Sequence, residues 1–379
     1  MKQRVMQPAV SVPFVDLRRA SDPIRTELLT RIGALVDSSA FTNGPDVGAF
    51  EQAFAAYCGT TECVGVASGL DGLVLGLRAA GLEPGDEVVV PAHTFVATVA
   101  SVVQAGGVPV LADIDERCYG LDPVAAESAV TSRTRFLLPV HLYGQMADMR
   151  ALVSLAEGRG LDIVEDACQA HGASRDGIRS GCAGRAAAFS FYPGKNLGAF
   201  GDAGAVVTDD AELAATVRAL REHGQRRKYE HELQGYTARL DTIQAIVLGL
   251  KLPLLDGWNE QRREVARFYG ESLAGVGDLV LPHVAPGSDP VWHLYVVRTA
   301  DPVGLAEWLA GRGVATGRHY PQPIHLSRAY RDLGGGPGSY PVAEALAREA
   351  LSLPIFPGIT EAELTAVVEG VQTYFDHVR

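Results

Sequence analysis

The chain has 379 residues, enough for one large domain and a smaller one, and its 47% hydrophobic and 21% charged residues are typical of a globular protein. It carries 33 basic and 45 acidic residues, a formal net charge of −12. This balance argues against nucleic acid or an anionic membrane surface as a partner, although a local basic pocket can still bind a small anion.

Short apolar runs alternate with helical patterns from about residue 60 onwards. The runs that we expect to be strands span residues 63–67, 88–90, 110–112, 136–140, 162–165, 187–191 and 205–207. Between them, Ser68 can cap a helix that continues to about Ala80, and another helix is expected over 148–157. Alternation at this spacing predicts an α/β fold with a large, mainly parallel sheet that has helices on both faces.

The pattern changes after a helical region around residues 242–258. A predicted strand at 292–298, a helix near 303–310, a strand at 314–319 and two C-terminal helices form a separate group of elements. We therefore expect a large α/β domain over residues 1–256, including the N-terminal segment, and a small α+β domain over residues 257–379.

The five cysteines are scattered and form no CxxC pair, which argues against a disulfide framework and a zinc site, so we expect no metal. The N-terminal segment MKQRVMQPAVSVPFVDL lacks the continuous apolar stretch of a signal peptide, and no apolar run reaches the length of a membrane span. These features predict a cytoplasmic protein without a membrane partner.

Lys195 lies in the segment SFYPGKNLGAFGDAG, directly after a predicted buried strand. An ordinary lysine sits on a solvated helix face, but the neighbours here are aromatic residues, proline, leucine and glycines, so the amine is expected to be partly desolvated. Burial lowers the pKa of a lysine and supplies the neutral amine that forms a Schiff base.

Asp166 lies in the segment IVEDACQAH, at the carboxyl end of a predicted strand, where open α/β sheets place their ligands. Such a carboxylate often only caps the next turn, but a pyridoxal cofactor needs an acidic partner for its ring nitrogen. The turn at 66–72 offers free N–H groups at a helix start, which suit a phosphate. Phe95, after another strand, could cover a planar cofactor or pack in the core.

These four segments, in this order, resemble the fold-type I pyridoxal-phosphate enzymes, and more narrowly the nucleotide-sugar aminotransferase family (the DegT-like group). The likeness runs from about Phe14 to the C-terminus and includes GDEVVVPAHTF, EDACQAHGA, SFYPGKNLGAFGDAGAVV, GYTARLDTIQA and RHYPQPIHL. It implies a fold-type I aminotransferase fold, pyridoxal 5'-phosphate as cofactor, and a homodimer, because the family's GYxxR segment reaches the neighbouring subunit's active site.

The resemblance also implies roles for individual residues. Lys195 would carry the cofactor covalently and Asp166 would pair with its ring nitrogen. Gln169 would approach the ring hydroxyl and Phe95 would stack on the ring. The phosphate would be held by Ser190, the backbone of Gly69 and Leu70, and Thr237 of the GYTAR segment. Two of these positions depart from the family, which usually has Thr in place of Leu70 and Asn in place of Thr237.

The implied reaction is transamination of a nucleoside-diphosphate keto-6-deoxyhexose, with L-glutamate as amino donor. The SGLDG, KYEHELQGY and HYPQPIHL stretches resemble the sugar 3-aminotransferases, so we expect amination at C3. The residues expected to bind substrate are Tyr192, Lys228, Tyr229, Arg239, His319 and Tyr320.

Several alternatives remain open. Lys228 and its neighbours could be a solvated charge run, and His319 could be a hinge residue between domains. The chain could be a C4 aminotransferase on a 4-keto-6-deoxy sugar nucleotide, or a lyase or desulfurase of the same fold. It could also be a non-catalytic relative that binds the cofactor in a regulatory role.

Overall fold

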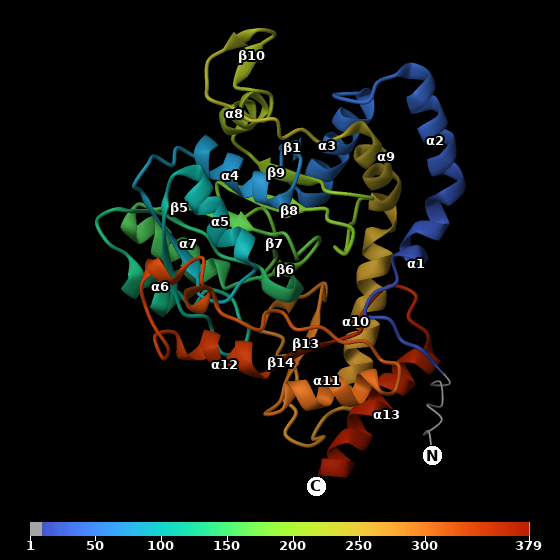
Figure 1. The fold of residues 1–379 in the computed structure, drawn as a ribbon. Helices are drawn as coiled ribbons and strands as arrows, with labels where there is room; N and C mark the ends of the chain where they lie inside the picture. The colour runs from blue at the N-terminus through green and yellow to red at the C-terminus, as the bar shows by residue number, and fades with distance from the viewer. Residues whose placement is uncertain (1–9, 379) are drawn as a thin grey trace.

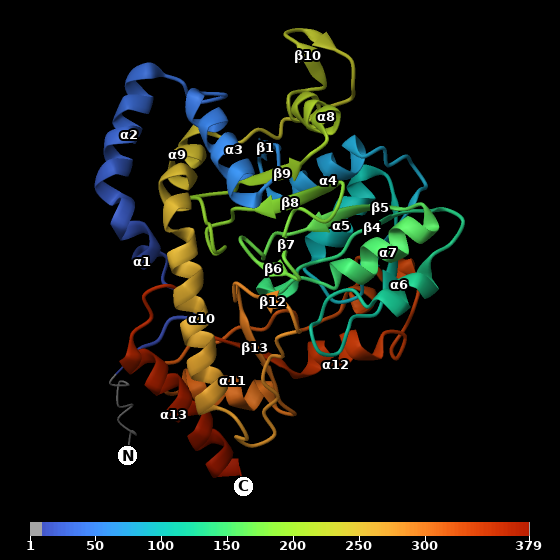
Figure 2. The ribbon, with the colours of Figure 1, turned by 180° about the vertical axis from the view of Figure 1, so that it is seen from behind.

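The computed structural model describes residues 10–378. The first nine residues of the N-terminal segment, which we predicted to lack a signal peptide, lie outside the described residues. A seven-stranded sheet, in the order β1-β9-β8-β5-β4-β2-β3, forms the centre of the molecule (Figures 1 and 2). Its strands are β1 (Glu62–Val66), β2 (Glu87–Pro91), β3 (Val108–Ala112), β4 (Thr134–Leu137), β5 (Asp162–Asp166), β8 (Ala186–Ser190) and β9 (Gly204–Thr208).

The predicted mainly parallel sheet is confirmed. The neighbours β8, β5, β4, β2 and β3 all run parallel, whereas β9 runs antiparallel to both β1 and β8. Each strand predicted in this region is present, but β4 stops at Leu137, three residues before the expected end. Pro139 lacks the N–H that a central strand needs at each position, which accounts for the early end.

Alternating side chains of the strands form the core on both faces of the sheet. Val88 and Val90 pack with helices α4 (Gly69–Ala79) and α5 (Val96–Ala105), while Val89 packs on the other face with α6 (Pro123–Ala129) and α7 (Met149–Arg159). This two-residue period is a property of any extended chain. Helices α3 (Pro45–Cys58) and α9 (Thr242–Lys251) cover the β8–β9 end on that second face.

The helical region expected around 242–258 consists of two helices. A 3-10 turn at Leu252–Leu254 joins α9 to the long helix α10 (Leu255–Ser272), which runs from the level of the sheet to the C-terminal helices (Figure 1). Pro253 cannot supply a helical N–H, so the hydrogen-bond ladder is interrupted there.

The C-terminal elements pack around the far half of α10. A two-stranded sheet of β13 (Tyr295–Arg298) and β14 (Ala350–Leu353) lies with helices α11 (Pro302–Ala310) and α13 (Glu361–Val378), and α12 (Pro341–Glu349) precedes β14. The strand predicted at 292–298 starts only at Tyr295, because Trp292 has a φ of 47°, outside the extended region.

The strand predicted over 314–319 is wrong. Val314 and Gly317 form only isolated bridges, with Val12 and Ser352, and the intervening residues are not extended strand. The place beside β13 is taken instead by β14, which the sequence pattern did not reveal.

We keep the division into residues 1–256 and 257–379 as a proposal. It falls in the first turn of α10, so both parts share one continuous helix. Val12, from the N-terminal segment assigned to the large part, packs with Leu305, Val314 and Val367 of the C-terminal part. None of the helices that the structure describes is long and apolar enough to cross a bilayer.

Candidate active site

One cavity of about 620 Å³ lies at the carboxyl ends of the parallel strands, between the sheet and the C-terminal elements. It brings together ten of the residues predicted from the sequence: Gly69, Leu70, Phe95, Asp166, Gln169, Ser190, Tyr192, Lys195, His319 and Tyr320. This is the edge at which open α/β sheets bind their ligands.

The loop that carries Lys195 is anchored on both sides. Before it, Phe189 and Phe191 of the β8 end pack edge-on against Phe54 of α3, with ring centroids 5.1 Å apart in each pair. After it, the side-chain amide of Asn196 donates to the Val291 carbonyl (2.8 Å). The loop is therefore held by buried contacts, and the lysine projects from a fixed base.

The amine of Lys195 lies at the cavity, unpaired and with a lowered pKa. It makes no hydrogen bond with any of residues 10–378. Burial lowers its pKa, and the nearby Cys168 and Asp166 act in the opposite direction. Burial also raises the pKa of Cys168 well above its ordinary value, so this thiol is protonated at neutral pH and is a poor nucleophile. A partly desolvated lysine amine is the chemistry that a Schiff base requires.

Asp166 ends strand β5 and is 6% exposed. The Thr98 hydroxyl donates to one carboxylate oxygen (2.7 Å), and the Cys168 backbone N–H donates to the other (3.2 Å). These contacts fix the plane of the carboxylate while leaving it at the cavity wall. A buried, oriented carboxylate of this kind can hold a proton on a ring nitrogen.

The start of helix α4 forms a close-packed turn. Ser68 caps the helix by accepting from the Asp71 N–H (3.0 Å), which leaves the N–H groups of Gly69 and Leu70 at the open end. A β-carbon at Gly69 would lie only 2.7 Å from both Cys168 Sγ and Ser190 Cβ. Only glycine fits here, so backbone N–H groups and the Ser190 hydroxyl can lie around one small anion.

Gln169 is held by both ends of its amide. Its oxygen accepts from the Tyr143 N–H (2.7 Å), and its nitrogen donates to the Tyr320 hydroxyl (3.1 Å). The amide nitrogen therefore has a second N–H that remains available toward the cavity. The Tyr320 ring also lies 5.5 Å from that of Phe95, so the two aromatic residues form one wall.

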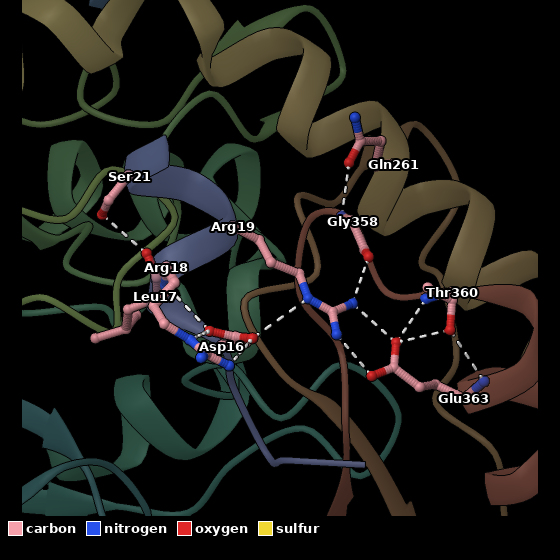
Figure 3. A network of polar contacts seen from close by, with 9 residues as sticks. All are labelled: Asp16, Leu17, Arg18, Arg19, Ser21, Gln261, Gly358, Thr360 and Glu363. Carbon is pink, nitrogen blue, oxygen red and sulfur yellow. Dashed lines mark hydrogen bonds and ion pairs between the residues drawn. The ribbon is translucent and has the colours of Figure 1, made fainter. Parts of the chain in front are cut away.

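The N-terminal segment contributes another wall. Phe14 stacks on the imidazole of His319 at 5.5 Å, and both line the cavity with Val15. Figure 3 shows how the following residues are tied down: the guanidinium of Arg19 donates to the carboxylate of Glu363 (2.7 and 2.8 Å) at the start of α13. This contact holds the N-terminal wall against the C-terminal elements.

Four predicted site residues lie outside the cavity. Lys228 and Tyr229 are on the hairpin of β10 (Gln225–Arg227) and β11 (Glu230–His231), which extends beyond α8 (Ala211–Arg221) in Figures 1 and 2. Thr237 is exposed beside His223, and Arg239 pairs with Glu222 (2.9 Å). Within one subunit these side chains do not contribute to the cavity that contains Lys195.

A model of the DegT/DnrJ/EryC1/StrS aminotransferase family matches residues 22–372. The chain belongs to this family. It is 49% identical to the dTDP-3-amino-3,4,6-trideoxy-alpha-D-glucose transaminase of Streptomyces venezuelae, over 97% of each chain. It is 48% identical to the erythromycin biosynthesis sensory transduction protein EryC1 of Saccharopolyspora erythraea, over 95% of this chain and 98% of the relative. The crystal structure of S. venezuelae DesV in complex with ketimine intermediate superposes with a TM-score of 0.94, at 49% identity, covering 97% of this chain and 99% of that one.

Membership of the DegT/DnrJ/EryC1/StrS family makes this chain a pyridoxal-phosphate-dependent aminotransferase, as predicted from its sequence. The site fits that cofactor on its own geometry. An unpaired lysine amine, a buried carboxylate, and a glycine turn with no room for a side chain lie around one cavity. The individual roles assigned to these residues remain predictions.

Sequence reasoning missed several residues of this aminotransferase site, notably Thr98, Arg262 and His293. Thr98 is the third residue of α5, and the signal that could have identified it is a hydroxyl in a mostly apolar helix. Arg262 lies on the buried face of α10, three residues after Asn259 and three before Val265. Helical periodicity could therefore have identified it as a buried charge.

Proposed function

We propose that this aminotransferase moves the amino group of L-glutamate to C3 of a nucleoside-diphosphate 3-keto-6-deoxyhexose. The observation that carries the proposal is the cavity in which the unpaired Lys195 amine and the buried Asp166 carboxylate lie together. Its substrate class is supported by the 49% identical Streptomyces relative, whose name places the amine at C3 of a dTDP-linked deoxy sugar.

Pyridoxal phosphate, when bound, draws electrons from the carbon that bears the amine. Lys195 would hold it covalently and, once displaced by the donor, would take the proton from the donor's α-carbon. Asp166, kept in place by Thr98, would hold the ring nitrogen protonated. Ser190 and the α4 turn at Gly69 would bind its phosphate.

The sugar would lie against the wall formed by Tyr192, His319 and Tyr320. Burial lowers the pKa of His319 to about 4, and the charge on Lys195 adds to this effect, so the imidazole is neutral at neutral pH. A neutral ring can donate or accept a hydrogen bond with a sugar hydroxyl without adding charge. Leu70 and Phe14 add apolar surface to the cavity, which suits a deoxygenated hexose.

The position of amination is testable with two ketones. We expect the purified protein, given L-glutamate, to turn over a dTDP-linked 3-keto-6-deoxyhexose, with NMR of the product showing the amine on C3. Omission of L-glutamate provides the control. Turnover of the 4-ketone alone would overturn the C3 assignment but leave the aminotransferase intact. Turnover of neither ketone would favour a regulatory role. The name of the Saccharopolyspora relative, a sensory transduction protein, describes a role of that kind.

We also propose that the active protein is a homodimer in which the β10–β11 hairpin completes the partner's site. Tyr229 is 79% exposed, and Lys228 lies over its ring at 5.3 Å with no acidic partner among the described residues. An exposed cation beside an aromatic ring suits the diphosphate of a sugar nucleotide. Phe95 lines the cavity and is 50% exposed, so the cavity is open on that side to such a contribution.

The shared site makes two predictions. Sedimentation should show a dimer, and Lys228→Ala should raise the KM for the sugar nucleotide by about tenfold while the response to L-glutamate is unchanged. Arg226→Ala is the matched control on the same hairpin, because Arg226 pairs with Glu212 and Glu232 of its own subunit. A fully active monomer would refute the proposal.

A further inference from the structure

Arg262 is a buried cation without an anion. It is 3% exposed, it lies on α10, and it forms no ion pair with any carboxylate of residues 10–378. Its neighbour Arg263, by contrast, pairs with Asp289 (2.8 Å). Burying an uncompensated charge is costly, so a structure retains one where an anion arrives later or where neutral acceptors surround it.

Neutral acceptors satisfy only part of the Arg262 guanidinium. One terminal nitrogen donates to the carbonyls of Trp292 (3.0 Å), His293 (3.3 Å) and Ile355 (2.9 Å). The Nε–H is buried with no partner among the described residues, and the second terminal nitrogen makes no hydrogen bond there either. A guanidinium has five N–H donors, and those on Nε and on the second terminal nitrogen have no partner among the described residues.

The same side chain lines the cavity that contains Lys195. Around it, burial holds the pKa of His293 well below its ordinary value, so that neighbour is neutral at neutral pH. Burial lowers the pKa of Arg262 to about 10, which still leaves it charged at that pH. The cavity therefore has a positive charge with unpaired donors on the side of α10, whereas the α4 turn, on a different element, suits the cofactor's phosphate.

We infer that Arg262 binds the α-carboxylate of the amino donor. The inference rests on the proposed function, because only an amino-acid donor brings a carboxylate on the carbon next to the amine. A guanidinium holds a carboxylate by two parallel hydrogen bonds and so fixes its orientation as well as its charge. With its carboxylate on Arg262, the donor would present its amine and α-carbon toward Lys195 from the side of α10.

The two half-reactions separate this role from a packing role. The first is followed by the absorbance of the bound cofactor as L-glutamate is added. The second is followed after loading the protein with pyridoxamine phosphate and adding the keto sugar nucleotide. Arg262→Lys should raise the L-glutamate concentration for half-maximal rate by about ten- to a hundredfold and leave the second half-reaction within about twofold of wild type.

A donor without the carboxylate gives the complementary measurement. 4-Aminobutyrate is L-glutamate lacking its α-carboxylate. The wild type should prefer L-glutamate strongly, and Arg262→Lys and Arg262→Gln should lose most of that preference. Arg267→Gln, on the exposed side of the same helix and paired with Glu260, should behave as wild type. If Arg262→Gln fails to fold, the donor preference of Arg262→Lys, compared with that of the wild type, still tests the contact with the α-carboxylate.

Several outcomes would overturn the inference. Equal slowing of both half-reactions would make Arg262 a packing residue that ties α10 to the loop at Trp292. A raised KM for the sugar nucleotide alone would assign the charge to the diphosphate. A wild type that accepts both donors equally would also exclude the carboxylate contact. If L-glutamate leaves the wild-type absorbance unchanged, the proposed donor itself is wrong and this inference fails with it.

Discussion

Replacing Lys195 by alanine is expected to abolish transamination while leaving the protein folded. The residue supplies both the covalent bond to the cofactor and the amine that moves the proton, so the loss should be on the order of a thousandfold or more in kcat. Its amine makes no hydrogen bond with any described residue, and the loop is held by Asn196 and its aromatic neighbours. Little stability should therefore be lost.

The measurement pairs turnover with two structural readouts. Circular dichroism and the melting temperature should match those of the wild type, and the yellow colour of the protein should be lost or shifted. Lys251→Ala is the matched control, because this second buried lysine donates to the Gly198 carbonyl (2.7 Å) and does not line the cavity. Substantial aminotransferase activity in the Lys195→Ala protein would end the assignment.

Replacing Asp166 by asparagine should preserve cofactor binding but lose most of the rate, on the order of a hundredfold or more. The amide has the same shape and can still accept from Thr98, but it cannot keep a ring nitrogen protonated. Transient kinetics with L-glutamate would measure this directly.

Asp162→Asn is the control for that variant. Asp162 starts the same strand, is 44% exposed at its side chain, and pairs on the surface with Arg185 (2.9 Å), a contact worth at most about 1 kcal/mol. Its rate should be that of the wild type. A near wild-type rate for Asp166→Asn would show that Asp166 serves only as a structural group at the end of β5.

Much of the fold follows from local sequence patterns. Apolar runs such as that at Val88–Val90 form central strands, because both faces of the sheet are covered and every position is buried. The C-terminal region was harder to predict. The residues over 314–319 look extended, but β14 occupies the pairing position beside β13, and this choice depends on contacts distant in sequence.

The site was predictable where its residues occur in compact segments. Lys195, Asp166 and Ser190 lie in segments that the resemblance identifies, and the structure places them in one cavity. Arg262 and Phe14 reach the same cavity from a helix face and from the N-terminus, and no short segment indicates this. Lys228 and Tyr229 lie outside the cavity, on the β10–β11 hairpin, and their predicted role depends on the proposed dimer.

The most direct test of this account is to identify the lysine that carries the cofactor. The chain has four lysines, Lys2, Lys195, Lys228 and Lys251, so borohydride reduction followed by peptide mapping gives an unambiguous answer. Burial lowers the pKa of Lys251 to about 8, which makes it the chemical competitor. The account predicts the mass of reduced pyridoxal phosphate on Lys195 and on none of the other three. A modification on Lys251, or none on any lysine, would contradict it.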